Sequence, residues 1–167
     1  MVQKYIIDIS SLKRLKDNYP PDSNLKEFND IWIKVERLIK RDELLSNEAV
    51  LREITRGKRD WLRLVFVKRY KKMFKINNKK IILKVMELVN QDASTGLLIK
   101  KKDIYDQKEV ADPYIVAQAL VSSEGALIPP YQIITEDGDM ANFVRKNYPN
   151  LTCLNALDFL KEILAKS

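Results

Sequence analysis

The chain has 167 residues, of which 46% are hydrophobic and 32% are charged, an ordinary composition for a globular protein with a buried core. Lysine and arginine (30) outnumber aspartate and glutamate (23), and the formal charge of +7 favours a polyanionic partner, most often nucleic acid. The chain contains no histidine, which excludes Ser-His-Asp and Cys-His catalysis. If the protein is an enzyme, carboxylates must carry its chemistry.

The single cysteine, Cys153, cannot form an intrachain disulfide or a structural zinc site, and it favours a reducing compartment. The apolar runs are far shorter than the ~20 residues of a membrane helix. The N-terminus lacks the basic, apolar and small-residue zones of a signal peptide. We therefore expect a cytoplasmic protein with no membrane segment, folded as a single domain over residues 1–167.

The first expected element is a buried parallel strand, because residues 5–9 read "YIIDI". Asp8 lies where this apolar run ends, although its surroundings are predicted to be dry. Apolar residues at helical spacing then predict an amphipathic helix over roughly residues 25–41. Asn24 and Glu27 form the pattern of a capping box at its start.

The middle of the chain predicts a second strand and several helices. Residues 43–46 ("ELLS") are a short strand candidate, and residues 47–57 predict a helix that ends at Gly57. Residues 58–92 look mostly helical and strongly basic. Their clearest part places four apolar residues on one side of a helix: Ile82, Val85, Met86 and Val89.

The last third of the chain repeats the same alternation. Residues 93–110 predict a loop with one short element. Asp112 as N-cap, Pro113 at the first helical position and Gly125 beyond the end predict a helix between them. Residues 131–149 predict strand, turn and helix, and residues 151–164 a final strand and helix. This order predicts an α/β three-layer sandwich with a central, mostly parallel sheet.

Acidic residues follow the predicted strands at matching places. Asp8 ends the first strand, Glu53 lies in the helix after the second, and Asp112 begins a later helix. Asp137, with Asp139 two residues on, follows the strand of residues 131–134. Sites in such sheets form beyond the carboxyl ends of the strands, so these side chains are expected to converge.

Converging carboxylates raise one another's pKa unless a cation lies among them, and carboxylates alone select hard cations such as Mg²⁺ or Mn²⁺. Each acid also has an ordinary structural explanation. Capping accounts for Asp112, turn chemistry accounts for Asp137, and Glu53 could lie on a solvated helix face. Asp8 is the hardest to explain in this way, because it stands in an isoleucine run.

The ordered set of motifs resembles the PIN-domain family of metal-dependent nucleases. The resemblance extends over most of residues 4–160 and rests on "YIIDISSL", "EAVLREI", "ADPYIVAQAL" and "IITEDGDM". It implies a PIN-like fold with one or two Mg²⁺ or Mn²⁺ ions. The acids that it implies as catalytic residues are Asp8, Glu53, Asp112 and Asp137. Metal would be held by Asp8, Asp112 and Asp137, with Glu53 as a ligand or water-orienting residue and Asp139 as the alternative fourth acid.

The same resemblance assigns supporting roles to Ser10 and Thr135. Small prokaryotic members are commonly VapC-type toxins that cut RNA until an antitoxin protein blocks the site, and family members often form homodimers. The implied function is therefore a metal-dependent endoribonuclease, with RNA and an antitoxin as partners. A flap-type nuclease acting on DNA and a non-catalytic binding module remain alternatives. A phosphatase with an aspartyl nucleophile is disfavoured, because Ser10 stands where it would need a second aspartate.

Basic segments between the second and third acids form a candidate phosphate-tracking surface, together with residues 100–102. Tyr70 or Trp61 could stack on a base, although burial in the core is the stronger expectation for Trp61 and Phe74. The alternative for the lysines is a solvated helical face. The candidate nucleic-acid-binding residues are Arg56, Lys58, Arg59, Lys68, Arg69, Lys71 and Lys72.

Overall fold

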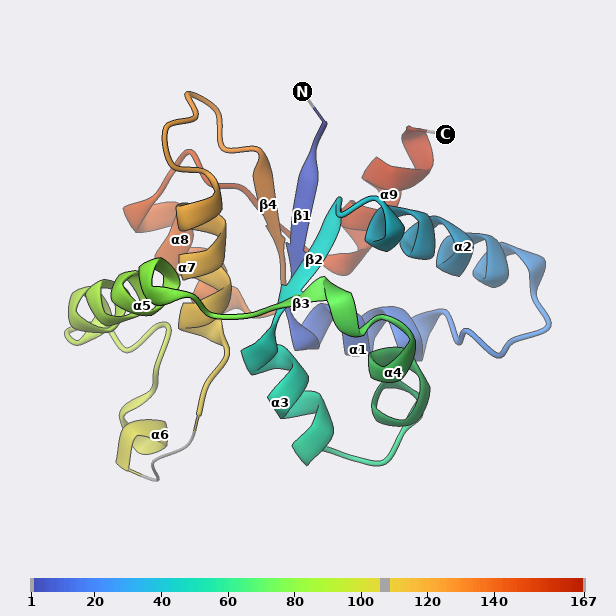
Figure 1. Cartoon of the computed structure of the whole chain (residues 1–167), viewed down its shortest axis with the longest axis horizontal. Helices are drawn as coiled ribbons and strands as arrows, with labels where there is room; N and C mark the ends of the chain where they lie inside the picture. The colour runs from blue at the N-terminus through green and yellow to red at the C-terminus, as the bar shows by residue number, and fades with distance from the viewer. Residues whose placement is uncertain (1, 106–108, 167) are drawn as a thin grey trace.

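The computed structural model describes residues 2–105 and 109–166 as a three-layer α/β sandwich (Figure 1). A five-stranded sheet with the order β3-β2-β1-β4-β5 forms the middle layer, and each pair of neighbouring strands is parallel. The α/β three-layer sandwich with a central, mostly parallel sheet that the sequence predicts is confirmed. The strands are β1 (Lys4–Ile7), β2 (Leu44–Asn47), β3 (Phe74–Lys75), β4 (Tyr131–Ile134) and β5 (Cys153–Leu154).

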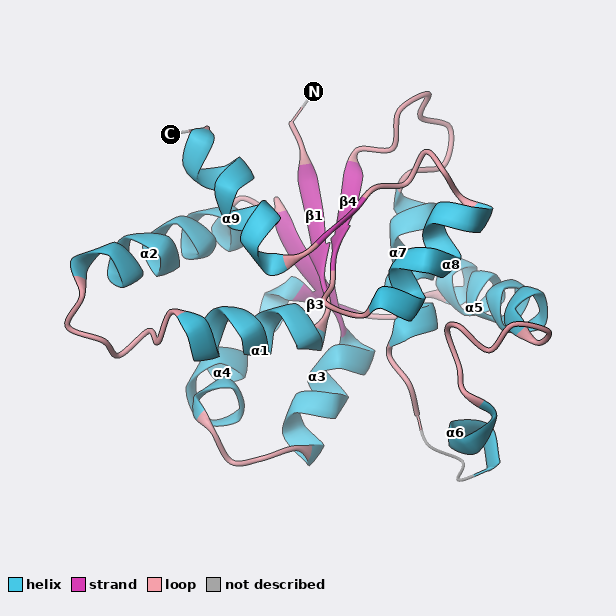
Figure 2. Cartoon of the chain, turned by 180° about the vertical axis from the view of Figure 1, so that it is seen from behind, coloured by secondary structure: helices cyan, strands magenta, loops and turns pink. Residues whose placement is uncertain are grey.

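The helices lie on both faces of this sheet, and the front and back views agree on their arrangement (Figures 1 and 2). One layer contains α5, α7 and α8, with α7 packed on β4, β2 and β1. The other contains α1, α2 and α9; α9 contacts both α1 and α2, and α2 packs on β2. The helices are α1 (Ile9–Asn18), α2 (Lys26–Lys40), α3 (Glu48–Arg56), η1 (Leu62–Phe66), α4 (Val67–Arg69), η2 (Lys71–Met73), α5 (Lys79–Asp92), α6 (Lys101–Tyr105), α7 (Asp112–Ser122), α8 (Gly138–Asn147) and α9 (Ala156–Ala165).

The strand order has a switch point between β1 and β4. The chain passes from β1 to β2 and β3 on one side, and then crosses to β4 and β5 on the other. Residues Lys4–Ile7 pair in register with Tyr131–Ile134, so the two strands end side by side. Loops that follow neighbouring strands diverge at such a point and leave room for a site. Ile6, Ile7, Ile133 and Ile134 are fully buried, which explains the isoleucine-rich runs.

Several predicted boundaries are confirmed and others are wrong. The helix expected over residues 25–41 is α2, which buries Ile31, Val35 and Ile39. The capping box at its start is wrong: Leu25 is the N-cap and makes no side-chain cap hydrogen bond. The signal failed because Ser23 caps the turn before the helix instead, with its hydroxyl accepting from the Leu25 N–H.

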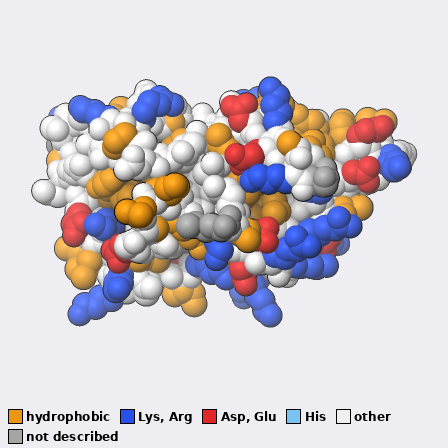
Figure 3. All heavy atoms as spheres, turned by 90° about the horizontal axis from the view of Figure 1, so that it is seen from above, with side chains coloured by type: hydrophobic (Ala, Val, Ile, Leu, Met, Phe, Trp, Pro, Cys, Tyr) orange, Lys and Arg blue, Asp and Glu red, His pale blue; other side chains and the backbone are white. Residues whose placement is uncertain are grey.

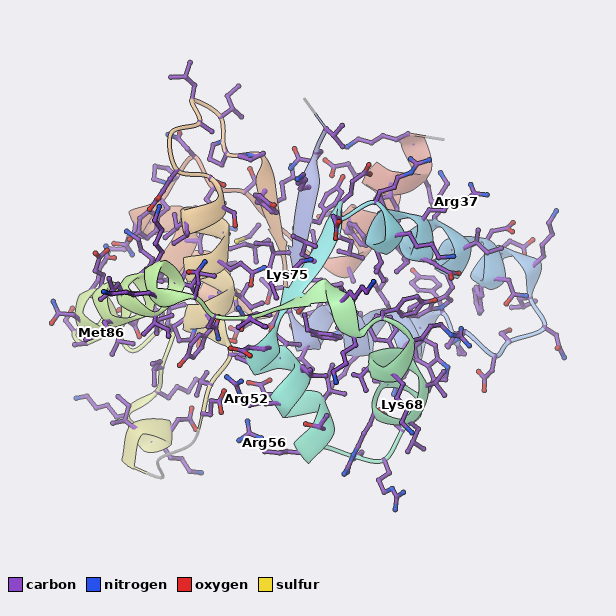
Figure 4. All side chains as sticks on the ribbon, in the orientation of Figure 1. Arg37, Arg52, Arg56, Lys68, Lys75 and Met86 are labelled. Carbon is purple, nitrogen blue, oxygen red and sulfur yellow. The ribbon has the colours of Figure 1, made fainter. Side chains whose placement is uncertain are left out.

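Two elements and one helix face were not predicted correctly. The sequence did not indicate α1, which begins directly after Asp8, and β3 lies inside the segment expected to be helical. On α5 the buried side is turned by one residue from the predicted one. Ile81, Val85 and Leu88 are buried, whereas Ile82 and Met86 are largely exposed (Met86 is labelled in Figure 4). Packing against α7, which only the tertiary structure defines, selects the buried side.

A buried polar network joins β2 to both neighbouring layers. The Asn47 side chain caps α3 by accepting from the Ala49 N–H, and its amide donates to Gln118 and Asn77. Gln118, on α7, donates in turn to the carbonyl oxygen of Ser46. Because each buried polar atom of this network has a partner, it holds α7 against the end of β2 without an unsatisfied group.

We expect Asn47→Ala to lower the free energy of unfolding by about 2–4 kcal/mol, because it removes a helix cap and leaves the buried Gln118 amide without its donor. Asn155→Ala is the matched control. Asn155 caps α9 through the Asp158 N–H but is exposed, so its loss should cost only about 1 kcal/mol. Urea unfolding of both variants measures the difference. Equal losses would show that the network contributes nothing beyond the cap.

Candidate functional site

Asp8 lies in a fully formed polar cradle at the end of β1. Its side chain is 2% exposed and accepts hydrogen bonds from the Ile9 N–H (2.8 Å), the Ser10 hydroxyl (3.1 Å) and the Thr135 hydroxyl (3.2 Å). Asp8 is therefore the N-cap of α1 as well as a buried acid. Three donors offset the cost of burying the carboxylate and orient it toward the switch point.

Ser10 and Thr135 tie the turn after β1 to the turn after β4. Ser10 accepts from the Glu136 N–H at 3.0 Å, and Thr135 accepts from the Asp137 N–H at 3.0 Å. Both hydroxyls also contact Asp8. The two residues predicted to support the site thus lie beside its first acid, and they fix the spacing of the two turns.

Asp112 is the acid whose structural explanation fails. The sequence predicted it as the N-cap of its helix, but Ala111 occupies that position, and no side-chain hydrogen bond caps α7. Asp112 is instead the first helical residue, and Pro113 the second. The acid is largely buried, and its carboxyl lies within hydrogen-bonding reach of Asp137.

Glu53 reaches the same place from α3. Its carboxylate accepts from the Ala111 N–H at 2.9 Å, so it binds the residue just before Asp112. Burial raises the pKa of Glu53, and the negative charge of Asp8 raises it further, while Arg56 and Lys13 act in the opposite direction. The solvated helix face considered from the sequence does not describe this residue.

Asp137 and Asp139 have different surroundings. The Asp137 side chain caps α8 by accepting from the N–H groups of Asp139 and Met140. Asp139 lies outside this group, and its half-exposed side chain lies 3.9 Å from the Lys100 ammonium. Asp137 is among the groups that raise the pKa of Asp112, and this position favours it over Asp139 as the fourth acid of the group.

The four acids interact electrostatically. Burial and, after it, the charges of Asp8, Asp137 and Glu53 together raise the pKa of Asp112 to about 9. Burial likewise raises the pKa of Asp8 against its hydrogen bonds, with Asp137 adding to the rise. Within residues 2–105 and 109–166, none of these four carboxylates forms an ion pair. We call Asp8, Glu53, Asp112 and Asp137 the acidic cluster.

The acidic cluster offers only oxygen donors, which suits Mg²⁺ or Mn²⁺. In the described part of the chain, no three acidic or thiol side chains already stand together as a ready-made cation site. The acids are close enough to perturb one another but not closed into a coordination shell, as expected for mutually repelling carboxylates. The donor set therefore fits a hard divalent cation, whose binding would have to draw the acids together.

A hollow of about 300 Å³, lined by three lysines and three acids, adjoins the cluster at Glu53. Its lining includes Lys13 and Lys16 from α1 and Lys58 from the turn after α3. Lys16 is paired with Asp17 and Asp60, whereas Lys13 and Lys58 form no ion pair with any described residue. Sequence reasoning missed Lys13, because it lies in the helix that the sequence did not indicate.

The other predicted basic residues lie in different surroundings. Arg56 and Arg52, labelled on α3 in Figure 4, both contact Glu109. Arg69 lines a separate hollow of about 310 Å³ with Trp61 and Tyr70. Trp61 packs edge-on against Trp32 at the margin of the core, and Phe74 is buried, as predicted. The remaining candidates, Arg59, Lys68, Lys71 and Lys72, are exposed.

Comparison with known protein families places the chain. Residues 5–163 match the family described as "Domain of unknown function (DUF4411)". The chain belongs to the DUF4411 family. Its match covers nearly the whole sequence, including every member of the acidic cluster. A search of curated proteins found no match.

This DUF4411 chain also resembles solved structures. One is PAE2754 from Pyrobaculum aerophilum, with 17% identity, a TM-score of 0.52 and coverage of 99% of this chain and 98% of that one. Another is VapBC2 from Rickettsia felis bound to a DNA fragment from their promoter. It has 17% identity, a TM-score of 0.45 and coverage of 93% and 98%. At this identity the likeness to PAE2754 concerns the fold alone.

The raised pKa of Asp112 predicts a pH-dependent stability. The pKa of Asp112 is near the ordinary 3.8 in the unfolded chain and about 9 in the folded chain, so the folded chain binds this proton more tightly. The stabilisation that the bound proton provides is therefore lost as the pH rises toward about 9. In EDTA, Asp112→Asn should melt higher than wild type at about pH 8, and the difference should shrink at about pH 5. Asp139→Asn is the control and should show no such change. A difference that is equal at both pH values would contradict the clustered arrangement.

Proposed function

We propose that this DUF4411 protein is a divalent-metal-dependent endoribonuclease, built as one PIN-like nuclease domain over residues 1–167. The observation that carries the proposal is Asp112, a largely buried acid without a cap bond that lies among Asp8, Glu53 and Asp137. Asp8 and Asp137 are helix caps and Glu53 accepts from the Ala111 N–H, but these bonds do not explain why Asp112 lies among the three other acids. Such a group is a candidate site for hydrolysis assisted by Mg²⁺ or Mn²⁺.

In this proposal Asp8, Asp112 and Asp137 hold one or two cations, and Glu53 is a further ligand or orients the attacking water. A bound divalent cation lowers the pKa of water and neutralises charge that develops on a phosphodiester. Ser10 and Thr135 favour the ionised form of Asp8 and aim it at the site by donating to its carboxylate. Lys13 and Lys58 lie where they can bind the phosphates of a strand that approaches Glu53.

The proposed biological role follows from the sequence resemblance to VapC-type toxins. It makes RNA the substrate, an antitoxin protein the inhibitor and a homodimer the assembly. Within residues 2–105 and 109–166, no helix is long and apolar enough to cross a membrane.

Cleavage of a mixed-sequence single-stranded RNA tests the activity, with wild type compared in Mn²⁺, Mg²⁺ and EDTA. Asp112→Asn should reduce the rate roughly a hundredfold or more, because it removes a charged ligand but no helix cap. Asp139→Asn should cut at close to the wild-type rate. Cleavage that persists in EDTA, or that survives Asp112→Asn, would contradict the proposal. Salt-dependent RNA binding without any cleavage would favour a non-catalytic module, and cleavage of DNA flaps alone would favour the DNA-directed alternative.

The lysines in the hollow beside Glu53 lead to a separate prediction about substrate binding. The double variant Lys13→Gln/Lys58→Gln should raise KM for RNA and flatten its dependence on salt, because two phosphate contacts are lost. Lys71→Gln/Lys72→Gln removes the same charge from an exposed segment and should change KM less. Steady-state kinetics across a salt series would decide. A larger effect from Lys71 and Lys72 would move the RNA path to the surface first predicted from the sequence.

A further inference from the structure

A third hollow, of about 330 Å³, lies at the opposite end of the sheet from the acidic cluster. It is bordered by residues that precede β1, by the last turn of α2 and by the end of α9. The acids follow the C-terminal ends of β1 and β4, whereas this hollow adjoins the N-terminal ends of β1 and β2. Figure 1 shows both chain termini at this end, away from α3. We call it the N-edge pocket.

Positive charge dominates the lining of the N-edge pocket. Four of its residues are cationic, Lys34, Arg37, Arg41 and Lys166, and one, Glu43, is acidic. In the view onto this end of the molecule, lysine and arginine side chains gather on the half that carries α2 and α9, beside hydrophobic surface (Figure 3). The sign is opposite to that of the acidic cluster, so the two sites would attract different ligands.

The cations of α2 lie on one face of the helix. Lys34, Arg37 and Arg41 are spaced by three and four residues, a spacing at which like charges repel. Some other surface cations are paired with acids on the same helix, as in Lys40–Glu36 and Lys84–Glu87. Among the described residues, neither guanidinium on this face forms an ion pair. Figure 4 shows Arg37 projecting from α2 on the side of α9.

The remaining cations are held in place by the fold. The Lys34 ammonium donates to the carbonyl oxygen of Ile163 at 3.0 Å, which ties α2 to α9. Lys166 donates to the buried Tyr5 hydroxyl at 3.1 Å and lies over its ring. Tyr5 in turn donates to Glu162 at 2.6 Å. This chain of contacts positions one side of the pocket before any ligand arrives.

The walls of the N-edge pocket are largely apolar. Val2, Leu38 and Ile163 lie among its lining residues, and Val2 is 59% exposed. Small-molecule sites combine such walls with a few convergent polar groups, and a volume near 300 Å³ is at the small end of their range. Arginine guanidinium groups bind phosphate with paired N–H donors.

From this combination we infer that the N-edge pocket binds a small phosphate monoester with an apolar or aromatic body. The phosphate would lie between Arg37 and Arg41, and the body would lie against Leu38 and Val2. The excess of cations favours a doubly charged phosphate over a carboxylate. The inference goes beyond the proposed nuclease activity and does not depend on it.

The test is a titration in EDTA, which removes divalent ions from the acidic cluster. Phenyl phosphate, inorganic phosphate and phenol are the probes, followed by calorimetry and by amide NMR shifts. We expect phenyl phosphate to bind roughly tenfold more tightly than inorganic phosphate, and phenol to bind least. Inorganic phosphate lacks the apolar body of the ligand, and phenol lacks its phosphate. The shifts should centre on Tyr5, Arg37, Arg41 and Lys166.

Two double variants make the test specific. Arg37→Gln/Arg41→Gln should weaken phenyl phosphate binding roughly tenfold or more, because it removes charge-assisted hydrogen bonds. Lys68→Gln/Lys72→Gln removes the same charge at the same spacing from an exposed segment and should leave binding nearly unchanged. The inference is overturned if no probe saturates by ~10 mM, if phosphate and phenyl phosphate bind equally, or if both variants lose the same affinity. Shifts centred elsewhere in wild type would overturn it without recourse to a variant.

Discussion

The mutual repulsion of carboxylates buried at one end of a parallel sheet is the constraint on which the rest of this structure depends. Asp8 is tolerated in an isoleucine core because three donors surround its carboxylate. Among the residues that the structure describes, no such donor bonds to Asp112, and burial with the neighbouring acids raises its pKa to about 9. The fold therefore stabilises the Asp8 carboxylate by hydrogen bonding and favours the protonated form of Asp112. A cation bound among the acids would change the electrostatic surroundings of both.

The frame around these acids is unusually polar for a core. Ser10 and Thr135 link the turns after β1 and β4, while Asn47 and Gln118 link β2 to α7. These contacts set the distance between helices that carry different acids. A purely apolar core could slide by a fraction of a helical turn, whereas fully paired hydrogen bonds allow one arrangement. The site thus inherits its precision from residues that would touch no substrate.

The two ends of the sheet differ in charge. Acids gather beyond the C-terminal ends of β1 and β4, and cations surround the N-edge pocket at the other end. Neither end neutralises the other, because a strand only four residues long still separates them by a layer of buried isoleucine and tyrosine. One small fold therefore places surfaces of opposite charge at the two ends of its sheet.

The sequence by itself determined the fold class, the parallel strands and the order of the acids. Each of these is encoded locally. Isoleucine runs specify buried strands, and an acid that directly follows such a run can be recognised from neighbouring residues alone. The tertiary structure decided the rest. In the structure Ala111 is the N-cap of α7 in place of Asp112, and β3 lies in a segment that was predicted to be helical. The buried face of α5 also differs by one residue from the predicted face. The tertiary structure also brought Lys13 beside Glu53 and gathered Arg37, Arg41 and Lys166 around one pocket. These outcomes depend on which elements pack together, and side-chain convergence between elements distant in the chain leaves no periodic signal in the sequence.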